Sequence, residues 1–186
     1  FKYDREHSWP KSLGFPSNAL SNPAYSDCHH LFAAYSSYNG SRSNKPYGEG
    51  SPSPEVRRPT VENLGRGGSH GTEESTSNYS FANVWQTWLG RRGDVARAML
   101  YMDVRYEGSV SAATEADLQL TEDPAQVTST NAAANGGDAF MGVRSGILKW
   151  HTEYQVNDLE RRRNTVVYLF QGNRNPFVDH PEWVST

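Results

Sequence analysis

Two long polar stretches, residues 48–80 and 107–143, divide the chain and limit what it can fold into. The first contains Ser51-Pro52-Ser53-Pro54 and a run of glycines, and the second is rich in Ala, Thr and Asn. We expect both to be loops, and loops this long in a compact domain are usually functional or mobile. The core must then come from three blocks, at residues 1–47, 83–108 and 146–183.

The size of the chain indicates one domain. With 186 residues it is long enough for one real core and too short for two. A mean hydropathy of −0.76 excludes a membrane protein, and an aromatic content of 12 % argues against a disordered chain. Cys28 is the single cysteine, which excludes an internal disulfide. We expect one domain over 1–186, with further residues removed or left out before Phe1 because the chain opens so close to a motif-rich segment.

The first block favours two strands and a short helix. A polar strand reaches His7 and is stopped by Trp9-Pro10. Residues 28–34 have the pattern of a second strand, and residues 36–44 that of one or two helical turns.

The second and third blocks favour helices. A short helix is expected from Asn83 to Trp88, and Gly93-Asp94 then opens a longer one that Gly108 stops. A further helical pattern starts at residues 147–150, and a long helix over 156–170 ends at Gly172. Its inward side chains are predicted to be Leu159, Val166, Val167 and Phe170. The tail is too rich in Pro and Asn for regular structure. Taken together, the three blocks predict a fold of the α+β class that is mostly helical, with long loops.

The charge pattern separates two regions. The net charge of −3 speaks mildly against nucleic-acid binding. Between Glu107 and Val143, however, there are six acidic residues and no Lys or Arg, whereas four arginines lie close together near the C-terminus: Arg161, Arg162, Arg163 and Arg174. The ordinary interpretation of Arg161–Arg163 is a solvated helix face. If a polyanion binds, it binds away from residues 107–143.

Glu6 and His7 form the first candidate site. A carboxylate beside an imidazole at a strand end brings two functions near one place, and Asn39 and Asn44 add amide oxygens from the following helix. Such a sparse oxygen set suits Mg²⁺, which keeps water and substrate phosphate as its other ligands. The chemistry it serves is phosphodiester hydrolysis, with His7 taking a proton from water.

Two other groups of residues in the sequence could carry chemistry. Asp179-His180 could activate a nucleophile, but a packed, hydrogen-bonded tail is the better interpretation. Cys28 with His29 or His30 could be a nucleophile pair, although adjacent strand residues point to opposite faces.

Five segments also resemble the motifs of the bacterial endonuclease I family, which are secreted or periplasmic nonspecific nucleases. The segments are similar to its EHxWPKS, DLHHL, VNSxRSNxPFG, RGDVARAxxYM and QGNRNPFxDHPE motifs. They occur in family order: Glu6–Ser12, Asp27–Leu31, Tyr38–Gly48, Arg92–Met102 and Gln171–Glu182. The two polar stretches fall outside the match.

The resemblance implies a ββα-metal finger active site within a single catalytic domain. It implies His7 as general base, Glu6 and Asn39 as ligands of Mg²⁺ (with Ca²⁺ or Mn²⁺ as substitutes), and cleavage of DNA, and often RNA, to 5′-phosphate and 3′-hydroxyl ends. The cation that stabilises the transition state stays open, because residues 8–26 hold Lys11 and no Arg. The candidates, in order, are Arg174, Arg97 and Arg42. His151 is interpreted as structural.

The resulting hypothesis is a secreted or periplasmic, monomeric, metal-dependent endonuclease that binds the phosphate backbone without base readout and does not bind membranes. One rival is a secreted nucleic-acid-binding protein with the same fold and little or no hydrolysis. Another is a phosphodiesterase that acts on small nucleotides.

Overall fold

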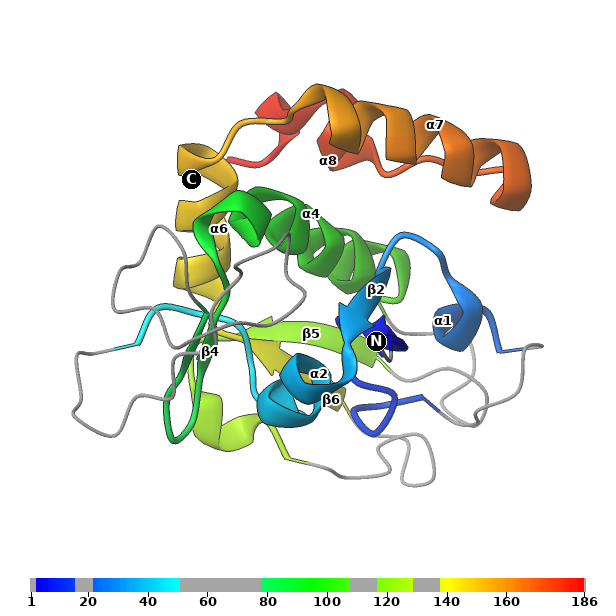
Figure 1. Cartoon of the computed structure of the whole chain (residues 1–186). Helices are drawn as coiled ribbons and strands as arrows, with labels where there is room; N and C mark the ends of the chain where they lie inside the picture. The colour runs from blue at the N-terminus through cyan, green and yellow to red at the C-terminus, as the bar shows by residue number, and fades with distance from the viewer. Residues whose placement is uncertain (1–2, 16–21, 51–77, 108–116, 129–137, 186) are drawn as a thin grey trace.

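The computed structural model describes residues 3–15, 22–50, 78–107, 117–128 and 138–185. Helix α4 (Leu89–Arg105) runs through the middle, with α7 (Asp158–Gln171) and α8 (Pro176–Asp179) above it in Figure 1. Strands β1 (Tyr3–His7) and β2 (Leu31–Tyr35) lie below it with α2 (Ser36–Arg42). In the described part, helices contribute more residues than strands, which agrees with the predicted α+β class.

Helix α4 is buried on most sides, as its sequence pattern predicts. Ala96, Met99 and Met102 are at most 1 % exposed and belong to the main core with Trp150. The prediction that Gly93-Asp94 opens this helix is wrong, because the helix begins at Leu89 and Asp94 lies inside it. An ion pair of Asp94 with Arg91, at 2.8 Å and i,i+3 spacing, belongs to this first part of the helix.

A hairpin replaces the short helix predicted over residues 83–88. Its strands are β3 (Tyr79–Ser80) and β4 (Trp85–Gln86), which pair antiparallel. The Trp85 N–H donates to the carbonyl of Pro46 at 2.8 Å, and Trp85 forms a parallel bridge with Tyr47. Hydrogen bonds to a distant segment therefore decide the conformation here, against the local helical pattern.

A parallel pair of strands interrupts the second polar stretch, which was predicted to be a loop throughout. Strand β5 (Asp117–Thr121) pairs with β6 (Asp138–Gly142) in register from Asp117–Asp138 to Thr121–Gly142. Leu118 and Met141 point into the core and are at most 1 % exposed. A short 3₁₀ turn, η2 (Pro124–Gln126), lies in the connection that a parallel pair requires.

The C-terminal part is helical, but α7 buries an unexpected face. Helix α6 (Arg144–Glu153) packs against α4. Helix α7 has Asn157 as its N-cap and is capped at its C-terminal end by Gly172 in the left-handed region (φ +85°). The prediction that Leu159, Val166 and Phe170 point inward is wrong, because they are 72 %, 51 % and 85 % exposed. The side chains that α7 buries are Glu160, Asn164 and Val167.

The tail also differs from prediction, since it forms two short turns of helix, α8 and η3 (Pro181–Trp183). Asn175 caps α8 by accepting the N–H of Phe177 at 3.0 Å, and Phe177 and Val178 are buried. Prolines at the first helical positions are compatible with such starts.

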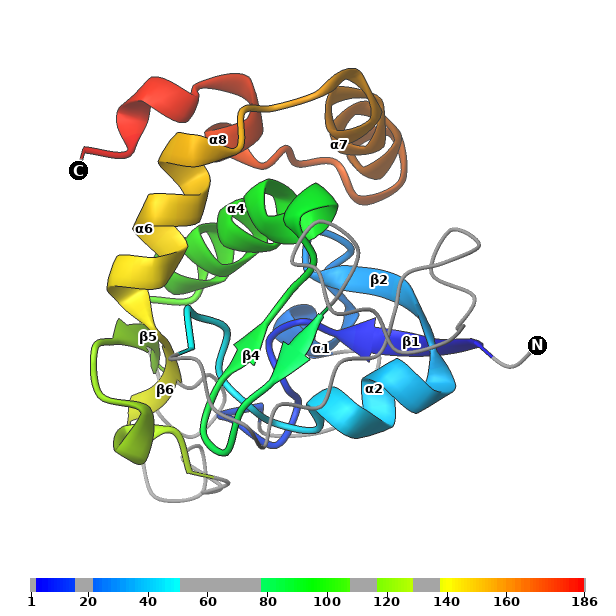
Figure 2. The same cartoon turned by 60° about the vertical axis from the view of Figure 1, so that its left-hand side comes forward.

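The N-terminal block has the predicted order of two strands followed by a helix. Strands β1 and β2 pair antiparallel from Tyr3–Tyr35 to His7–Leu31, and α2 packs on both, as Figure 2 shows. Helix α1 (Pro23–Ser26) lies in the connection between the strands. None of the helices in the described part is long and apolar enough to cross a bilayer.

Candidate functional site

The end of strand β1 presents Glu6 and His7 to opposite sides of the β1–β2 pair. Neighbouring strand residues alternate between the two faces. The Glu6 side chain lies toward α2, where it meets Arg42, and the His7 ring lies against α1 and the ring of His30. Arg42 links the two, because one of its nitrogens donates both to the Glu6 carboxylate and to the His7 carbonyl.

The imidazole of His7 is held with a defined tautomer. Its Nε2 lies 3.0 Å from the carbonyl oxygen of Tyr25, and its ring stacks on the Tyr25 ring at 4.7 Å. A carbonyl can only accept, so Nε2 carries the hydrogen and Nδ1 keeps a lone pair in the neutral ring. Burial lowers the pKa of His7, against the opposing effect of the Tyr25 carbonyl. The ring is therefore neutral near pH 7 and able to accept a proton at Nδ1.

Glu6 is oriented by Arg42. The two side chains form an ion pair at 2.7 Å, and Arg42, 3 % exposed, also donates to the carbonyls of Ser8 and Lys45. Burial raises the pKa of Glu6, which Arg42 opposes and the nearby charge of Asp4 reinforces. A cation beside Glu6 would favour its ionised form.

Asn39 reaches the same face of β1 from α2. Its Nδ2 donates to the Asp4 carboxylate at 3.2 Å, which turns the amide oxygen away from that contact. Asp4 and Glu6 are two residues apart and therefore lie on the same face of the strand, so two carboxylates and one amide oxygen gather there. Oxygen donors of this kind fit Mg²⁺, Ca²⁺ or Mn²⁺. No group of three or more His, Cys, Asp or Glu with metal-binding geometry occurs in the described part, so any cation here would rely on the mixed carboxylate and amide set.

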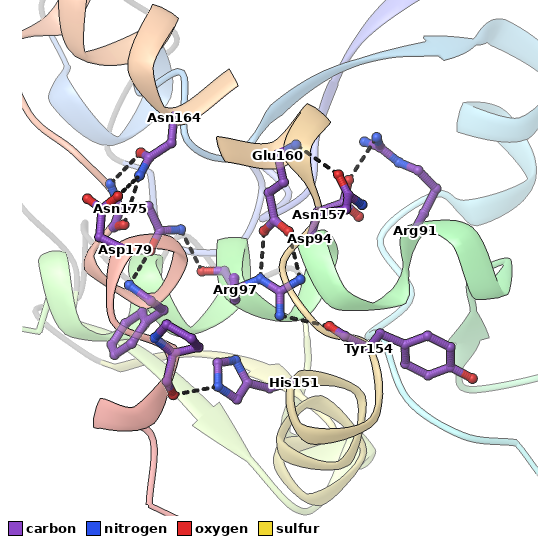
Figure 3. Close-up of polar contacts among 12 residues, drawn as sticks. Arg91, Asp94, Arg97, His151, Tyr154, Asn157, Glu160, Asn164, Asn175 and Asp179 are labelled. Atoms are coloured by element: carbon purple, nitrogen blue, oxygen red, sulfur yellow. Dashed lines mark hydrogen bonds and ion pairs between the residues drawn. The ribbon is translucent and has the colours of Figure 1, made fainter. Parts of the chain in front are cut away.

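Arg97 is not brought to this site. Its guanidinium is 1 % exposed and donates to both carboxylate oxygens of Glu160, at 2.6 and 2.7 Å, and to the Tyr154 carbonyl at 2.9 Å. Figure 3 shows this arrangement between α4 and the start of α7. The Arg97 guanidinium therefore has a structural role, in which it joins α4 to α7.

Arg174 is not brought to it either. It makes two hydrogen bonds to the Asp179 carboxylate, at 2.6 and 2.8 Å, and Asn164 donates to the same carboxylate. Neighbouring His180 stacks on Trp183 at 4.4 Å and contacts Glu182, so Asp179 and His180 serve different partners. In the described part, neither Arg97 nor Arg174 hydrogen bonds to β1 or α2.

Three further histidines are bound to backbone carbonyls through Nε2, whereas His70 lies outside the described residues. His29 contacts the carbonyl of Asn173, His30 that of Ala24 and His151 that of Pro181. The Cys28 thiol lies 3.8 Å from the Ser26 carbonyl. These contacts give the three histidines anchoring roles, and the described contacts pair none of them with the thiol.

Asp27 is a structural centre that sequence reasoning missed. Although 3 % exposed, it accepts hydrogen bonds from the Tyr101 and Tyr106 hydroxyls, from Gln171 and from the His29 N–H. Burial acts to raise the pKa of Asp27, but these hydrogen bonds hold it below its usual range. It ties the turn before β2 to α4 and α7. No local sequence pattern signals such a set of distant partners.

Arg5 and Lys11 are the cations whose charges act on His7, and both lower its pKa. Arg5 lies on the His7 face of β1 and donates to the Tyr25 hydroxyl at 2.8 Å. Sequence reasoning passed over Arg5 as a candidate cation. The two-residue period of a strand places it with His7 and could have identified it.

Comparisons with known proteins agree with the motif pattern. The sequence profile of the family described as Endonuclease I matches residues 2–182. Two curated relatives, the extracellular ribonucleases of Bacillus subtilis (strain 168) and Bacillus amyloliquefaciens, are each 34 % identical over 184 residues. The alignment covers 97 % of this chain and 52 % of each relative, so the chain spans about half the length of the curated relatives it matches.

Proposed function

The chain belongs to the endonuclease I family, and from this premise we propose that it is a Mg²⁺-dependent nuclease that hydrolyses phosphodiester bonds of RNA and DNA. The proposal rests above all on one arrangement, in which a neutral imidazole with a free Nδ1 lies at the strand end that also carries the Glu6 carboxylate. The β1–β2–α2 unit would then act as a ββα-metal finger.

Glu6 and Asn39 would hold the cation, with Asp4 next to them. When bound, Mg²⁺ supplies positive charge to the phosphate oxygens and to the departing oxygen. Arg42 keeps the Glu6 carboxylate in place, and Asp4 turns the Asn39 amide so that its oxygen is available. These positioning contacts are already present in the protein alone.

His7 would act as the general base. Its Nδ1 takes a proton from water while the water oxygen bonds to phosphorus and the bond from phosphorus to the 3′ oxygen breaks. The leaving oxygen takes a proton from solvent, which yields a 5′-phosphate and a 3′-hydroxyl. The carbonyl of Tyr25 holds the opposite edge of the ring throughout, so Nδ1 remains the proton acceptor.

The relatives support RNA as a substrate and export from the cell, since both are named extracellular ribonucleases. We expect the chain to act as a monomer and to recognise the phosphate backbone without base readout. Binding should therefore weaken steeply with salt.

The proposal is tested by incubating supercoiled plasmid and a structureless RNA with the protein in Mg²⁺, with and without EDTA. We expect nicking and RNA cleavage that EDTA abolishes, and loss of both in His7→Ala with oligonucleotide affinity largely kept. His180→Ala removes an exposed histidine and is the matched control, expected to retain activity.

The rival functions give different results in the same assay. Binding without metal-dependent cleavage would indicate a nucleic-acid-binding protein. Cleavage of a dinucleotide ester with intact plasmid and RNA would indicate a small-nucleotide phosphodiesterase. Near-normal turnover of His7→Ala would show that His7 is not the base.

A further inference from the structure

Phe32 supports two arginines on the Glu6 face of the β1–β2 pair. It is the register partner of Glu6, and directly opposite residues of an antiparallel pair project from the same face. The guanidinium of Arg91 lies over the Phe32 ring at 4.6 Å, and that of Arg163 lies over the same ring at 4.4 Å. Two cations from different helices, α4 and α7, thus meet on one ring beside a carboxylate.

Arg91 is partly open to solvent. Its side chain is 36 % exposed, and one of its terminal nitrogens pairs with Asp94. Figure 3 shows Arg91 and Asp94 at one edge of the polar network between the helices. The flat guanidinium therefore rests on Phe32 with part of its edge toward solvent, which is the arrangement a phosphate oxygen can reach.

Arg163 is held in place by backbone carbonyls. Its Nη2 donates to the carbonyls of Cys28 and Leu31, at the start of β2. Burial, and after it the charge of Arg91, lowers the pKa of Arg163. The two guanidiniums consequently lie within electrostatic range of each other. Asp94 and Glu160 offset part of the repulsion between the two arginines, and a phosphate anion close to both would offset more of it.

We propose that Arg91 and Arg163, stacked on Phe32, form a binding site for a phosphate group of the nucleic-acid strand next to the Glu6 end of the site. Planar guanidiniums match the oxygens of a phosphodiester and can each donate two hydrogen bonds to it. The inference rests on the proposed function for its substrate class, but it concerns binding alone and needs no cation.

The counter-ion of Glu6 is Arg42, so the charges of Arg91 and Arg163 do not serve to neutralise that carboxylate. Their position differs from that of Arg97 and Arg174, which are each locked in a bidentate pair with one carboxylate. The site on Phe32 therefore supplies backbone-binding charge that the sequence-based candidates do not.

The test measures binding of a fluorescent single-stranded oligonucleotide in EDTA across a salt series, so that no cleavage occurs. We expect Arg91→Ala to weaken binding about 10-fold at low salt and to reduce the slope of log K against log salt by about 0.7, the value for one lost phosphate contact on a single strand. Arg161→Ala is the control, because it removes the same charge from an exposed position about 200° around α7 from Arg163. Its slope should equal that of the wild type.

A second variant guards against an indirect effect through the Asp94 ion pair. Arg91→Ala with Asp94→Asn leaves no unpaired carboxylate, and it should show the same reduced slope. Arg163→Lys keeps the charge but loses the planar fork, and it should weaken binding less than Arg91→Ala does.

The proposal is overturned if Arg91→Ala has the slope and affinity of Arg161→Ala. That result is distinguishable from failure of the proposed function, which is measured by Mg²⁺-dependent cleavage. If the wild type cleaves as expected and Arg91→Ala binds as the wild type does, the phosphate site alone is refuted. If the wild type does not cleave but Arg91→Ala shows the reduced salt slope, the nuclease function alone is refuted.

Discussion

The buried pair of Arg97 and Glu160 makes a quantitative prediction that also decides between a structural and a catalytic role for this arginine. Replacing Arg97 by Met removes three hydrogen bonds and leaves the Glu160 carboxylate, 7 % exposed, without its partner. Removing one member of a buried pair typically costs about 3–5 kcal/mol. That is a large part of the roughly 5–15 kcal/mol that stabilises an ordinary domain.

The double variant Arg97→Met with Glu160→Leu should recover about half of this loss. Replacing a buried pair by apolar side chains of similar volume is often neutral. The Tyr154 carbonyl still loses a donor, which costs about 1–3 kcal/mol. We therefore expect the double variant to lie about 1–3 kcal/mol below wild type. Because Arg97→Met and Glu160→Leu each leave a buried charge unpaired at a cost of about 3–5 kcal/mol, the favourable coupling energy between the two positions should be at least about 3 kcal/mol.

Urea unfolding of the four proteins measures the cycle, and cleavage by the folded fraction measures function. The structural role predicts near-normal turnover in the double variant, because the hydrogen bonds of both side chains in the described part go to residues outside β1 and α2. A cost below about 1 kcal/mol for Arg97→Met would refute the energetic argument, since such a cost is typical of surface substitutions. A stable double variant that has lost cleavage would instead give Arg97 a catalytic role.

Three further predictions concern stability. Burial raises the pKa of Asp94 to about 6, above the 3.8 of an unperturbed carboxyl, so wild-type stability should fall as the pH rises from about 4 to about 6 and above. This pKa shift corresponds to about 3 kcal/mol of stability. In urea unfolding, Asp94→Asn should therefore be more stable than wild type at pH 8 but not at pH 4. An equal difference in stability between variant and wild type at both pH values would contradict this. Val167→Ala should lower the free energy of unfolding by about 1–2 kcal/mol. Phe170→Ala, at an 85 % exposed position, should lower it by less than about 0.5 kcal/mol. Equal losses of stability in thermal melts of the two variants would show that the buried face of α7 is assigned wrongly. Gly172→Ala should cost about 1 kcal/mol because φ is +85°, and an unchanged melting temperature would count against that conformation.

Local patterns in the sequence were sufficient for elements whose conformation depends on their own residues. The strand that ends at His7, the helix after the second strand and the helix that ends at Gly172 all follow from turn-forming residues and apolar spacing. The hairpin near Trp85 and the parallel strands β5 and β6 could not be predicted in this way. Trp85 of the hairpin bonds to the distant Pro46–Tyr47 segment, and β5 pairs with a strand that follows it by about twenty residues. Short strands also carry few apolar positions.

The inward face of α7 shows a different limit of sequence patterns. Apolar residues were assigned to the core, but Glu160 and Asn164 occupy it because Arg97 and Asn175 satisfy them there. Polar partners on another helix make a polar face the buried one. The same limit applies to the candidate site. The motif pointed to Glu6, His7 and Asn39, whereas the contacts of Asp4 with Asn39 and of Arg91 with Phe32 join segments far apart in the sequence.

Binding of Mn²⁺ to the protein alone tests the central claim of an oxygen-donor cation site most directly. Titration followed by electron paramagnetic resonance of the free ion should show one site per chain. Asn39→Ala should weaken it at least about 10-fold, while Asn44→Ala, which alters the second Asn of the same motif at an exposed position, should bind as wild type does. Equal binding by wild type and Asn39→Ala, or no Mn²⁺ binding by the wild type, would contradict the account.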